Sequence, residues 1–250
     1  MPPRYEVIGV EGIGEVRPGD DVARLVLEAA VRQGTPVVSG DVLVLSQKIL
    51  SKAEGRLLRL SAITPSTMAT TFATELGRDP RLIEVILRES RRVVRMDRGV
   101  LVTETRHGWV CANAGVDQSN VDADMVALLP EDPDRSARAF RDAVRTQTRA
   151  EVFVIVADTF GRPWREGLVN IAIGVAGVAP LKSYLGECDP AGRPLQATVL
   201  ALADELASAA EPVMGKLDRI PAAIVRGLAI AVAEDGSKPL LRDPARDLFR

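Results

Sequence analysis

The chain has 250 residues, of which 46% are apolar and 26% are charged, and its formal net charge is −2. This composition is typical of a globular protein with enough apolar residues for a core of its own. Because the chain has no basic excess, it lacks the charge that binding to a nucleic-acid backbone requires. The two cysteines, Cys111 and Cys188, form no CxxC pair, which excludes a disulfide framework and a cysteine zinc site.

The sequence contains no segment that would enter or cross a membrane. No run of about 18 apolar residues occurs, and the first ten residues lack the apolar stretch of a signal peptide. We therefore expect a cytoplasmic protein. No linker divides the chain, so we expect one domain over residues 1–250, with room for two interlocked subdomains.

Helix caps, turn residues and apolar periodicity predict the elements of the first half. In chain order these are a strand over Tyr5 to Val10, a loop over Ile13 to Gly19, a helix from Asp20 and Asp21 to Gln33, a strand over Asp41 to Ser46, a helix from Thr64 to Gly77 and a helix from Pro80 to about Arg91. The segment DVLVLS is apolar on both faces, which predicts a central strand.

The second half mixes strands and helices without regular alternation. The predicted elements are strands over Val100 to Glu104 and Trp109 to Ala112, a helix over Asp134 to Thr148, a strand over Glu151 to Ala157, a helix over Ala197 to Ala210 and a strand from Ala222. Between them, Gly161 to Pro194 is expected to be a loop region around a short apolar helix, Leu168 to Val175. The mixture predicts an α+β fold with mixed or antiparallel sheets.

The standard nucleotide-binding motifs are absent. Gly215-Lys216 is the only Gly-Lys pair, and it lacks the earlier glycine and the following Ser or Thr of a P-loop. The segment from Gly12 to Gly14 follows a strand, but Val16 and Pro18 stand where a Rossmann motif needs glycine.

A short polar segment, NAGVDQSN, runs from Asn113 to Asn120 after an apolar strand. Asp117 and Asn120 offer the hard oxygen atoms that Mg²⁺ or Mn²⁺ prefers. The alternative is an ordinary turn rich in Asn, Asp and Ser.

A second polar segment, ADTFGRPWREG, follows the apolar strand EVFVIV. Asp158 and Thr159 place a carboxylate beside a hydroxyl, and Arg162 and Arg165 add positive charge suited to phosphate or carboxylate. The alternative is a capping Asp-Thr pair followed by a solvated loop. A carboxylate, a hydroxyl and two arginines are groups found at phosphate sites.

A third segment, SQKILSKAEGR, is expected to be a loop. It carries Lys48 and Lys52, which are four residues apart and would share one face if they lay on a helical turn. Lysine binds phosphate as a compact charge, although a solvated basic loop is the alternative. His107, the only histidine, is expected to be an exposed turn residue, and Cys111 a buried small residue. Together the three segments suit phosphoryl transfer without naming a substrate.

At these segments the chain resembles the coenzyme F420-0:L-glutamate ligases. The resemblance covers nearly the whole chain and includes several motifs in the same order. They are VEGIGEVRPGDD, GDVLVLSQKILSKAEGR, NAGVDQSN, DTFGRPWREG, AIGVAGVAPLKSYLGECDPAGRPL and IPAAIVRGL.

The resemblance implies a reaction, a fold and an assembly. The terminal carboxylate of F420-0, or of its dehydro form, would be phosphorylated by GTP, and the amino group of L-glutamate would attack the acyl phosphate. Further rounds could extend a γ-linked tail. The family has its own α+β fold without a P-loop and forms an intertwined homodimer. A C-terminal nitroreductase-like domain, present in the mycobacterial type, is not expected.

The resemblance also implies residue roles. Asp117, Asp158 and Thr159 match positions that hold divalent metal, with two Mg²⁺ or Mn²⁺ sites expected. The GTP contacts match the loop of Ile13, Gly14, Glu15 and Val16, together with Gln47, Lys52 and Asn120. Arg162 and Arg165 are catalytic candidates on their charge alone.

The chain departs from the family pattern at three places. At Gln47 the family often has serine. The family's first loop often reads GLPLI, whereas this chain has GIGEV, which brings Glu15 close to an expected triphosphate. The segment MGKLDRIP replaces a more glycine-rich, acidic stretch, so no ligand contact is carried over onto Lys216 to Arg219.

Three other functions fit parts of the sequence. An amide ligase for a different carboxylate would keep the metal and GTP sites. A nucleotide-binding or F420-binding protein would bind without turnover, and a structural α+β protein would have no site.

Overall fold

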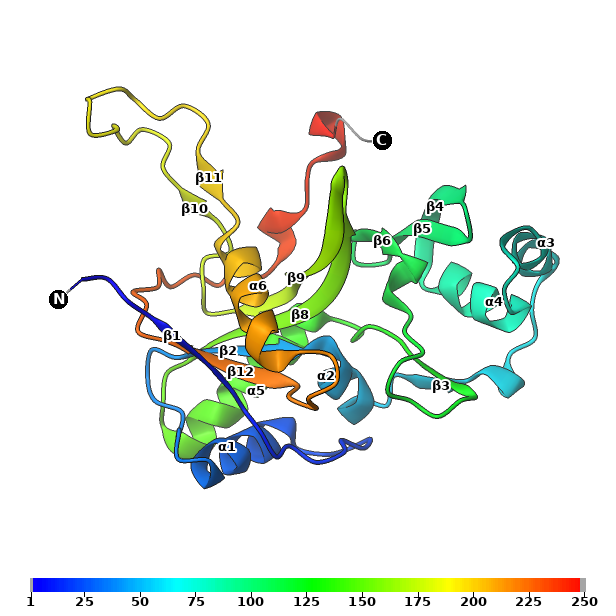
Figure 1. The fold of residues 1–250 in the computed structure, drawn as a ribbon, viewed down its shortest axis with the longest axis horizontal. Helices are drawn as coiled ribbons and strands as arrows, with labels where there is room; N and C mark the ends of the chain where they lie inside the picture. The colour runs from blue at the N-terminus through cyan, green and yellow to red at the C-terminus, as the bar shows by residue number, and fades with distance from the viewer. Residues whose placement is uncertain (1, 248–250) are drawn as a thin grey trace.

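The computed structural model describes residues 2–247 and confirms an α+β fold with mixed and antiparallel sheets (Figure 1). The main lobe contains a five-stranded sheet in the order β1-β12-β2-β8-β9. Its strands are β1 (Glu6–Gly9), β2 (Val42–Ser46), β8 (Phe153–Arg162), β9 (Arg165–Ala176) and β12 (Ala222–Arg226). Within this sheet β2 and β8 run parallel and the other neighbours run antiparallel. The predicted central position of the second strand is confirmed.

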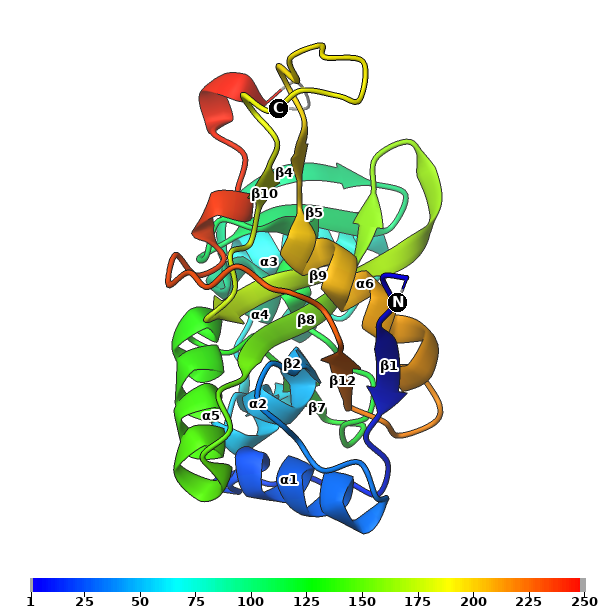
Figure 2. The same cartoon turned by 90° about the vertical axis from the view of Figure 1, so that its left-hand side faces the viewer.

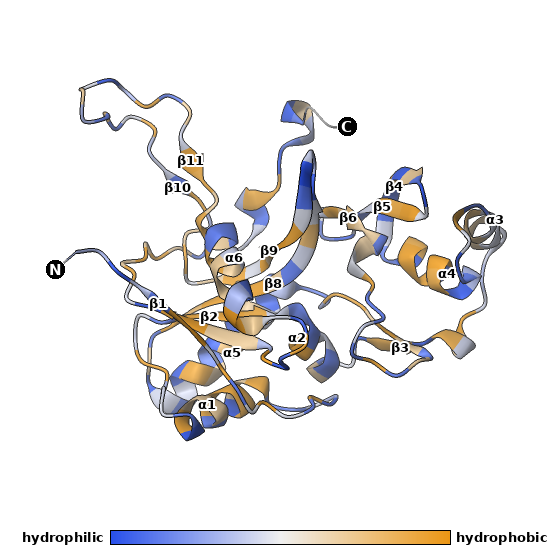
Figure 3. Ribbon diagram, viewed as in Figure 1, coloured by the Kyte–Doolittle hydropathy of each residue, from blue (hydrophilic) through white to orange (hydrophobic). Residues whose placement is uncertain are grey.

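Helices cover both faces of this sheet (Figure 2). One face packs on α1 (Val22–Arg32) and α5 (Pro133–Thr148), and the other packs on α6 (Leu202–Met214). Strand β2 serves both layers, because Leu43 and Leu45 join the first core and Val42 and Val44 join the second. This is why the strand is apolar on both faces, as Figure 3 shows for the middle of the sheet.

A smaller lobe lies beside the main sheet (Figure 1). It contains a two-stranded and a three-stranded sheet and two helices around a third hydrophobic core. Its elements are β3 (Leu57–Arg59) paired with β7 (Met125–Ala127), the sheet of β4 (Ser90–Asp97), β5 (Val100–Thr105) and β6 (Val110–Ala112), and the helices α3 (Thr67–Leu76) and α4 (Pro80–Arg88). The helix α2 (Gln47–Ala53) connects the lobes.

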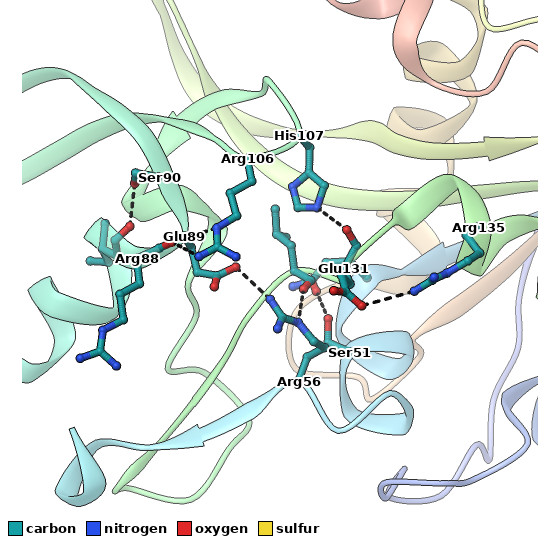
Figure 4. Close-up of polar contacts among 12 residues, drawn as sticks. Ser51, Arg56, Arg88, Glu89, Ser90, Arg106, His107, Glu131 and Arg135 are labelled. Atoms are coloured by element: carbon teal, nitrogen blue, oxygen red, sulfur yellow. Dashed lines mark hydrogen bonds and ion pairs between the residues drawn. The ribbon is translucent and has the colours of Figure 1, made fainter.

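Polar contacts hold the two lobes together at one junction (Figure 4). The guanidinium of Arg56 donates to the carbonyl of Leu129 at 3.0 Å and to Glu89 at 2.8 Å. The Nε2 atom of His107 lies 3.0 Å from the carbonyl of Glu131. The expectation of an exposed His107 is therefore wrong, because the ring is partly buried against this junction.

Side-chain caps begin several of the helices, and the cap at Asp21 was predicted. The side chains of Asp21, Ser66, Asp79 and Asp132 each accept a hydrogen bond from a backbone N–H of the first turn of the following helix. None of the helices within residues 2–247 has the length and apolar character to cross a lipid bilayer.

The region from Gly161 to Pro194 differs most from the prediction. The expected helix at Leu168 to Val175 is wrong, because these residues lie in β9 and pair with β8 along its length. A short apolar run without a polar face does not distinguish strand from helix, and the partner strand decides it. The strand expected to end at Ala157 continues to Arg162, so Asp158 and Thr159 lie within a strand.

Two further element boundaries were wrong. The helix expected to reach Arg91 ends at Arg88, because β4 begins two residues after that, at Ser90. The helix expected over Ala197 to Ala210 begins at Leu202, because Val199–Leu200 forms β11, which pairs with β10 (Lys182–Ser183). The segment between β10 and β11 forms an arm that extends away from the main lobe (Figure 1).

Glu84 of α4 is predicted to stabilise the small lobe in a pH-dependent manner. Its carboxylate accepts the backbone N–H of Ser66, the cap of α3, at 2.9 Å and is bonded to Arg88 at 2.8 Å. Ser66 and then Arg88 lower the pKa of Glu84 to about 2. Because the folded pKa lies below the unfolded value, this stability is full above pH ~4.5 and is lost as the pH falls towards 2.

Glu84→Gln is therefore expected to lower the free energy of unfolding by about 1–2 kcal/mol at pH 7. Urea unfolding across pH 7 to 2 measures the difference from wild type, which should shrink steadily below pH ~4.5 and be nearly gone at pH ~2. Glu75→Gln on the exposed side of α3 serves as the control. A difference that is the same at pH 7 and pH 2.5 would contradict this role.

Candidate functional site

Asp117 lies where the small lobe meets the main sheet. Its backbone N–H and carbonyl bond to Ala127 at 2.9 and 2.8 Å. Its carboxylate lies 2.6 Å from the ammonium of Lys48 and accepts the backbone N–H of Ser119 at 2.7 Å. Burial alone would raise the pKa of Asp117, but Lys48 and Ser119 outweigh burial and lower it. The carboxylate is therefore ionised and fixed in place.

Lys48 and Lys52 lie on one helix, α2, so the loop expected over this segment is wrong. The two lysines contact different carboxylates. Lys48 also donates to the carbonyl and the hydroxyl of Ser119 at 2.9 and 2.6 Å, which anchors the turn that carries Asp117. Lys52 is buried and contacts the carboxylate of Glu15. The helix thus directs one ammonium to the carboxylate site and the other to the first loop.

Asp158 projects from β8 near Asp117. Burial raises the pKa of Asp158 to about 7, and the charge of Asp117 adds to that shift. A backbone hydrogen bond from Thr159 and the ammonium groups of Lys48 and Lys216 oppose it. A cation placed between the two carboxylates would favour the ionised form of Asp158.

A closed ring of hydrogen bonds lies beside Asp158. The hydroxyl of Thr159 donates to the side chain of Asn170 at 2.7 Å, and the amide of Asn170 donates to Glu211 at 2.6 Å. The ammonium of Lys216 closes the ring, at 2.8 Å from Glu211 and 2.7 Å from the hydroxyl of Thr159. Each member of the ring is therefore held by two of the others.

The first loop and the start of α2 form the next part of the region. Ile13 and Val16 are buried in the core, whereas Gly14 and Glu15 are exposed. The side chain of Gln47 is also buried and accepts a hydrogen bond from Ser51 at 2.7 Å. The carboxylate of Glu15 is paired with the ammonium of Lys52. Its negative charge is therefore partly neutralised and repels a nearby anion less than an unpaired carboxylate would.

A pocket of about 490 Å³ opens beside this loop. Its lining comes from the loop and from the segment before β12, namely Glu11, Gly12, Ile13, Asp218, Arg219 and Ile220. The two segments whose sequences differ from the family pattern, MGKLDRIP and GIGEV, therefore line the same pocket.

Asn120, Arg162 and Arg165 lie farther out. Asn120 is exposed in the turn after Ser119, with a φ of +55°. Arg162 and Arg165 face each other at the end of the β8–β9 hairpin, which is hydrophilic in Figure 3. Arg162 is four residues beyond Asp158, about 13 Å along an extended strand at about 3.3 Å per residue. Its guanidinium donates to the carbonyl of Glu166 at 2.9 Å.

The donors near Asp117 and Asp158 fit a hard divalent ion better than zinc. Within residues 2–247 no cluster of three or more His, Cys, Asp or Glu side chains is arranged to hold a metal. Mg²⁺ and Mn²⁺ are commonly held by one or two carboxylates, with water and substrate phosphates completing the shell. Cys111 offers no thiolate, because burial and the charge of Asp158 raise its pKa to about 12.

Sequence reasoning missed three residues of this region. Asn170 and Glu211 belong to no motif that we singled out, and no ligand contact was carried over onto Lys216. Asn170 is the one polar side chain in the apolar run LVNIAIGV, which is a signal that a strand carries a functional or structural polar group. Lys216 belongs to the Gly-Lys pair that fails the P-loop pattern, and the sequence gives no signal for Glu211.

Comparisons with known proteins point to one family. Residues 12–227 match the family described as F420-0:Gamma-glutamyl ligase. The chain is 46% identical over 247 residues to the Coenzyme F420:L-glutamate ligase of Methanothermobacter thermautotrophicus, which covers 98% of each protein. It is 48% identical over 241 residues to that of Methanopyrus kandleri, covering 94% of each. It is 40% identical over 248 residues to that of Archaeoglobus fulgidus, covering 99% of this chain and 97% of the relative.

Proposed function

The chain belongs to the F420-0:gamma-glutamyl ligase family, and from that premise we propose that it is a ligase that joins L-glutamate to coenzyme F420-0 through an amide bond. The observation that carries the proposal is the meeting of Asp117 and Asp158 from two lobes. Lys48 and Lys216 flank them, within electrostatic reach of Asp158. Such a group of charges suits the transfer of a phosphoryl group, in which positioning and neutralisation provide most of the catalysis.

The reaction proceeds through an acyl phosphate. The terminal phosphoryl group of GTP passes to the terminal carboxylate of F420-0, or of its dehydro form, and GDP leaves. The amino group of L-glutamate then attacks the acyl carbon, phosphate leaves with the bonding electron pair, and the amine loses a proton. Repeating the two steps on the new γ-carboxylate extends the tail.

Asp117 and Asp158 would hold Mg²⁺ or Mn²⁺. Thr159, the third position that the resemblance implies, has its hydroxyl bonded to Asn170 and Lys216 instead. The ion would neutralise the triphosphate and the charge that develops during transfer. Asp117 can bind an ion in addition to Lys48 and Ser119, because an ionised carboxylate has about four acceptor positions. Lys48 fixes its orientation, and Lys216 adds a positive charge on the other side of Asp158.

GTP would lie along the first loop and α2. The proposed contacts are the loop from Ile13 to Val16, Gln47, Lys52 and Asn120. Lys52 becomes available to phosphate when its contact with Glu15 opens, and the side chain of Glu15 is 71% exposed. In that exchange the carboxylate of Glu15 turns to solvent, and a phosphate oxygen takes its place beside the buried ammonium of Lys52, so that this charge stays paired.

Arg162 and Arg165 would serve the substrate from the hairpin end. Their distance from Asp158 along β8 suits an anionic group of an incoming substrate better than the transferred phosphoryl group itself. Arg162 has a fixed guanidinium, since it bonds to the carbonyl of Glu166.

We also propose that the protein is a homodimer in which the β10–β11 arm packs on the second copy. The arm extends from the main lobe and carries exposed apolar side chains, among them Leu185 and Val199 (Figure 1). Exposed apolar groups on an extended arm are typical of a surface that another chain covers.

A mass-spectrometric assay tests the function. Purified protein is mixed with F420-0, L-glutamate, GTP and Mn²⁺ or Mg²⁺, and each component is omitted in turn. The expected product is heavier than F420-0 by one or more glutamyl units and forms only when all components are present. A folded protein that binds GTP and metal but forms no product would instead favour an amide ligase for another carboxylate.

A further inference from the structure

The ammonium of Lys216 occupies one side of the hydroxyl of Thr159. It donates to Thr159 at 2.7 Å and is paired with Glu211 at 2.8 Å. The side chain of Lys216 is 59% exposed, and its ammonium is held at two points, by Glu211 and by Thr159. Asn170, which is 4% exposed, holds both Thr159 and Glu211 and thereby fixes the position of the ring.

This arrangement leaves the hydroxyl of Thr159 poorly suited to a divalent ion. Its proton is donated to Asn170, and one of its two lone pairs accepts from Lys216. A divalent ion bound about 2.1 Å from that oxygen would lie close to a positive ammonium. A neutral hydroxyl offers no charge to offset the repulsion between the two cations.

The charges on the two sides of Asp158 differ. On one side, the carboxylates of Asp117 and Asp158 lie near the single ammonium of Lys48. When both carboxylates are ionised, this side carries a net negative charge. On the other side, Glu211 and Lys216 balance each other, and Thr159 and Asn170 are neutral. A divalent ion is attracted to the first side and gains little on the second.

We infer that the ammonium of Lys216 stands where a second divalent ion would bind. Each chain therefore holds one divalent ion, which lies between Asp117 and Asp158. This inference rests on the proposed function, because it assumes that the two carboxylates bind a divalent ion. Lys216 is a positioning residue for the metal content of the site, and its charge faces the same phosphate groups that a second ion would neutralise.

Replacing Lys216 with glutamine tests the inference. The substitution removes the ammonium, leaves Glu211 without its partner and supplies an amide oxygen, which are conditions that favour a second hard cation. Mn²⁺ binding is measured by equilibrium dialysis with a non-hydrolysable GTP analogue, and a protein-free chamber corrects for metal held by the nucleotide. The expected content is one ion per chain in the wild type and two in Lys216→Gln.

Two further variants control the count. Lys216→Arg keeps the positive charge and is expected to bind one ion, and Lys238→Gln, at an exposed position outside the ring, is also expected to bind one. Electron paramagnetic resonance gives an independent readout, because two neighbouring Mn²⁺ ions broaden each other's signal. That broadening is expected only in Lys216→Gln.

The outcomes separate this inference from the proposed function. Two ions in the wild type, or one ion in a folded Lys216→Gln, would overturn the role of Lys216. If Lys216→Gln does not fold, two ions in Lys216→Arg or in the wild type still overturn it, and one ion in both supports it. No bound ion in the wild type would overturn the metal site of the proposed function, and the inference with it.

Discussion

Asp158→Asn is expected to lower kcat for glutamate ligation by a factor of about 100 or more, because it removes the proposed metal-binding charge, and such a charge is worth several kcal/mol at a phosphoryl centre. Asparagine keeps the shape of the side chain, so the loss would come from the charge. The same variant should bind Mn²⁺ more weakly, which a titration with the ion alone measures. Steady-state kinetics give kcat, and circular dichroism checks the fold.

The same substitution is expected to leave stability unchanged or to raise it. The pKa of Asp158 is raised to about 7, so the folded state disfavours its ionised form. Since the unfolded pKa is ~4, the cost of ionising Asp158 grows as the pH rises from ~4 to ~7 and is fully present above pH ~7, and a neutral asparagine removes that cost. Asp142→Asn on the exposed side of α5 is the control for both measurements. A folded Asp158→Asn with wild-type kcat would contradict the site.

Arg226→Met is expected to lower the free energy of unfolding by about 3 kcal/mol, because removing one partner of a buried ion pair leaves the other charge uncompensated. Asp41 directly precedes β2 and is 1% exposed. Its carboxylate accepts hydrogen bonds from the Nε and Nη2 atoms of Arg226 at 2.8 and 2.7 Å. The pair joins β12 to the end of the chain segment that enters β2, within the same sheet that carries Asp158 on β8. Urea unfolding at pH 7 measures the loss.

Two comparisons make this result specific. Arg24→Met breaks an exposed pair with Glu28 on α1 and is expected to cost less than about 0.5 kcal/mol. Asp41→Asn combined with Arg226→Met is expected to recover part of the loss, since no buried charge is left alone. A loss below about 0.5 kcal/mol in Arg226→Met itself would show that the pair does not stabilise the sheet.

The sequence predicts most elements whose signals are local. The cap at Asp21 and the breaks at Gly34 and Gly77 mark helix ends, and they are confirmed. The segment from Leu168 to Val175 has no such signal, and its strand is decided by pairing with β8. The central position of β2 was readable because apolar side chains occupy both faces of the segment.

The sequence also predicts that Asp117 and Asp158 are important but not what surrounds them. Each lies in a polar segment after an apolar strand, which is a local pattern. Their approach across two lobes, the contact of Lys52 with Glu15, and the ring that includes Lys216 depend on segments far apart in the chain. Such long-range pairs leave no periodic or motif signal in one sequence.

The most direct test of the account follows an oxygen atom. F420-0 labelled with ¹⁸O in its terminal carboxylate is incubated with unlabelled GTP, L-glutamate and Mn²⁺ under single-turnover conditions. Mass spectrometry then measures the label in the released phosphate. Transfer through an acyl phosphate predicts one ¹⁸O atom in the phosphate for each amide bond formed. An amide product accompanied by unlabelled phosphate would contradict phosphoryl transfer to the carboxylate at this site.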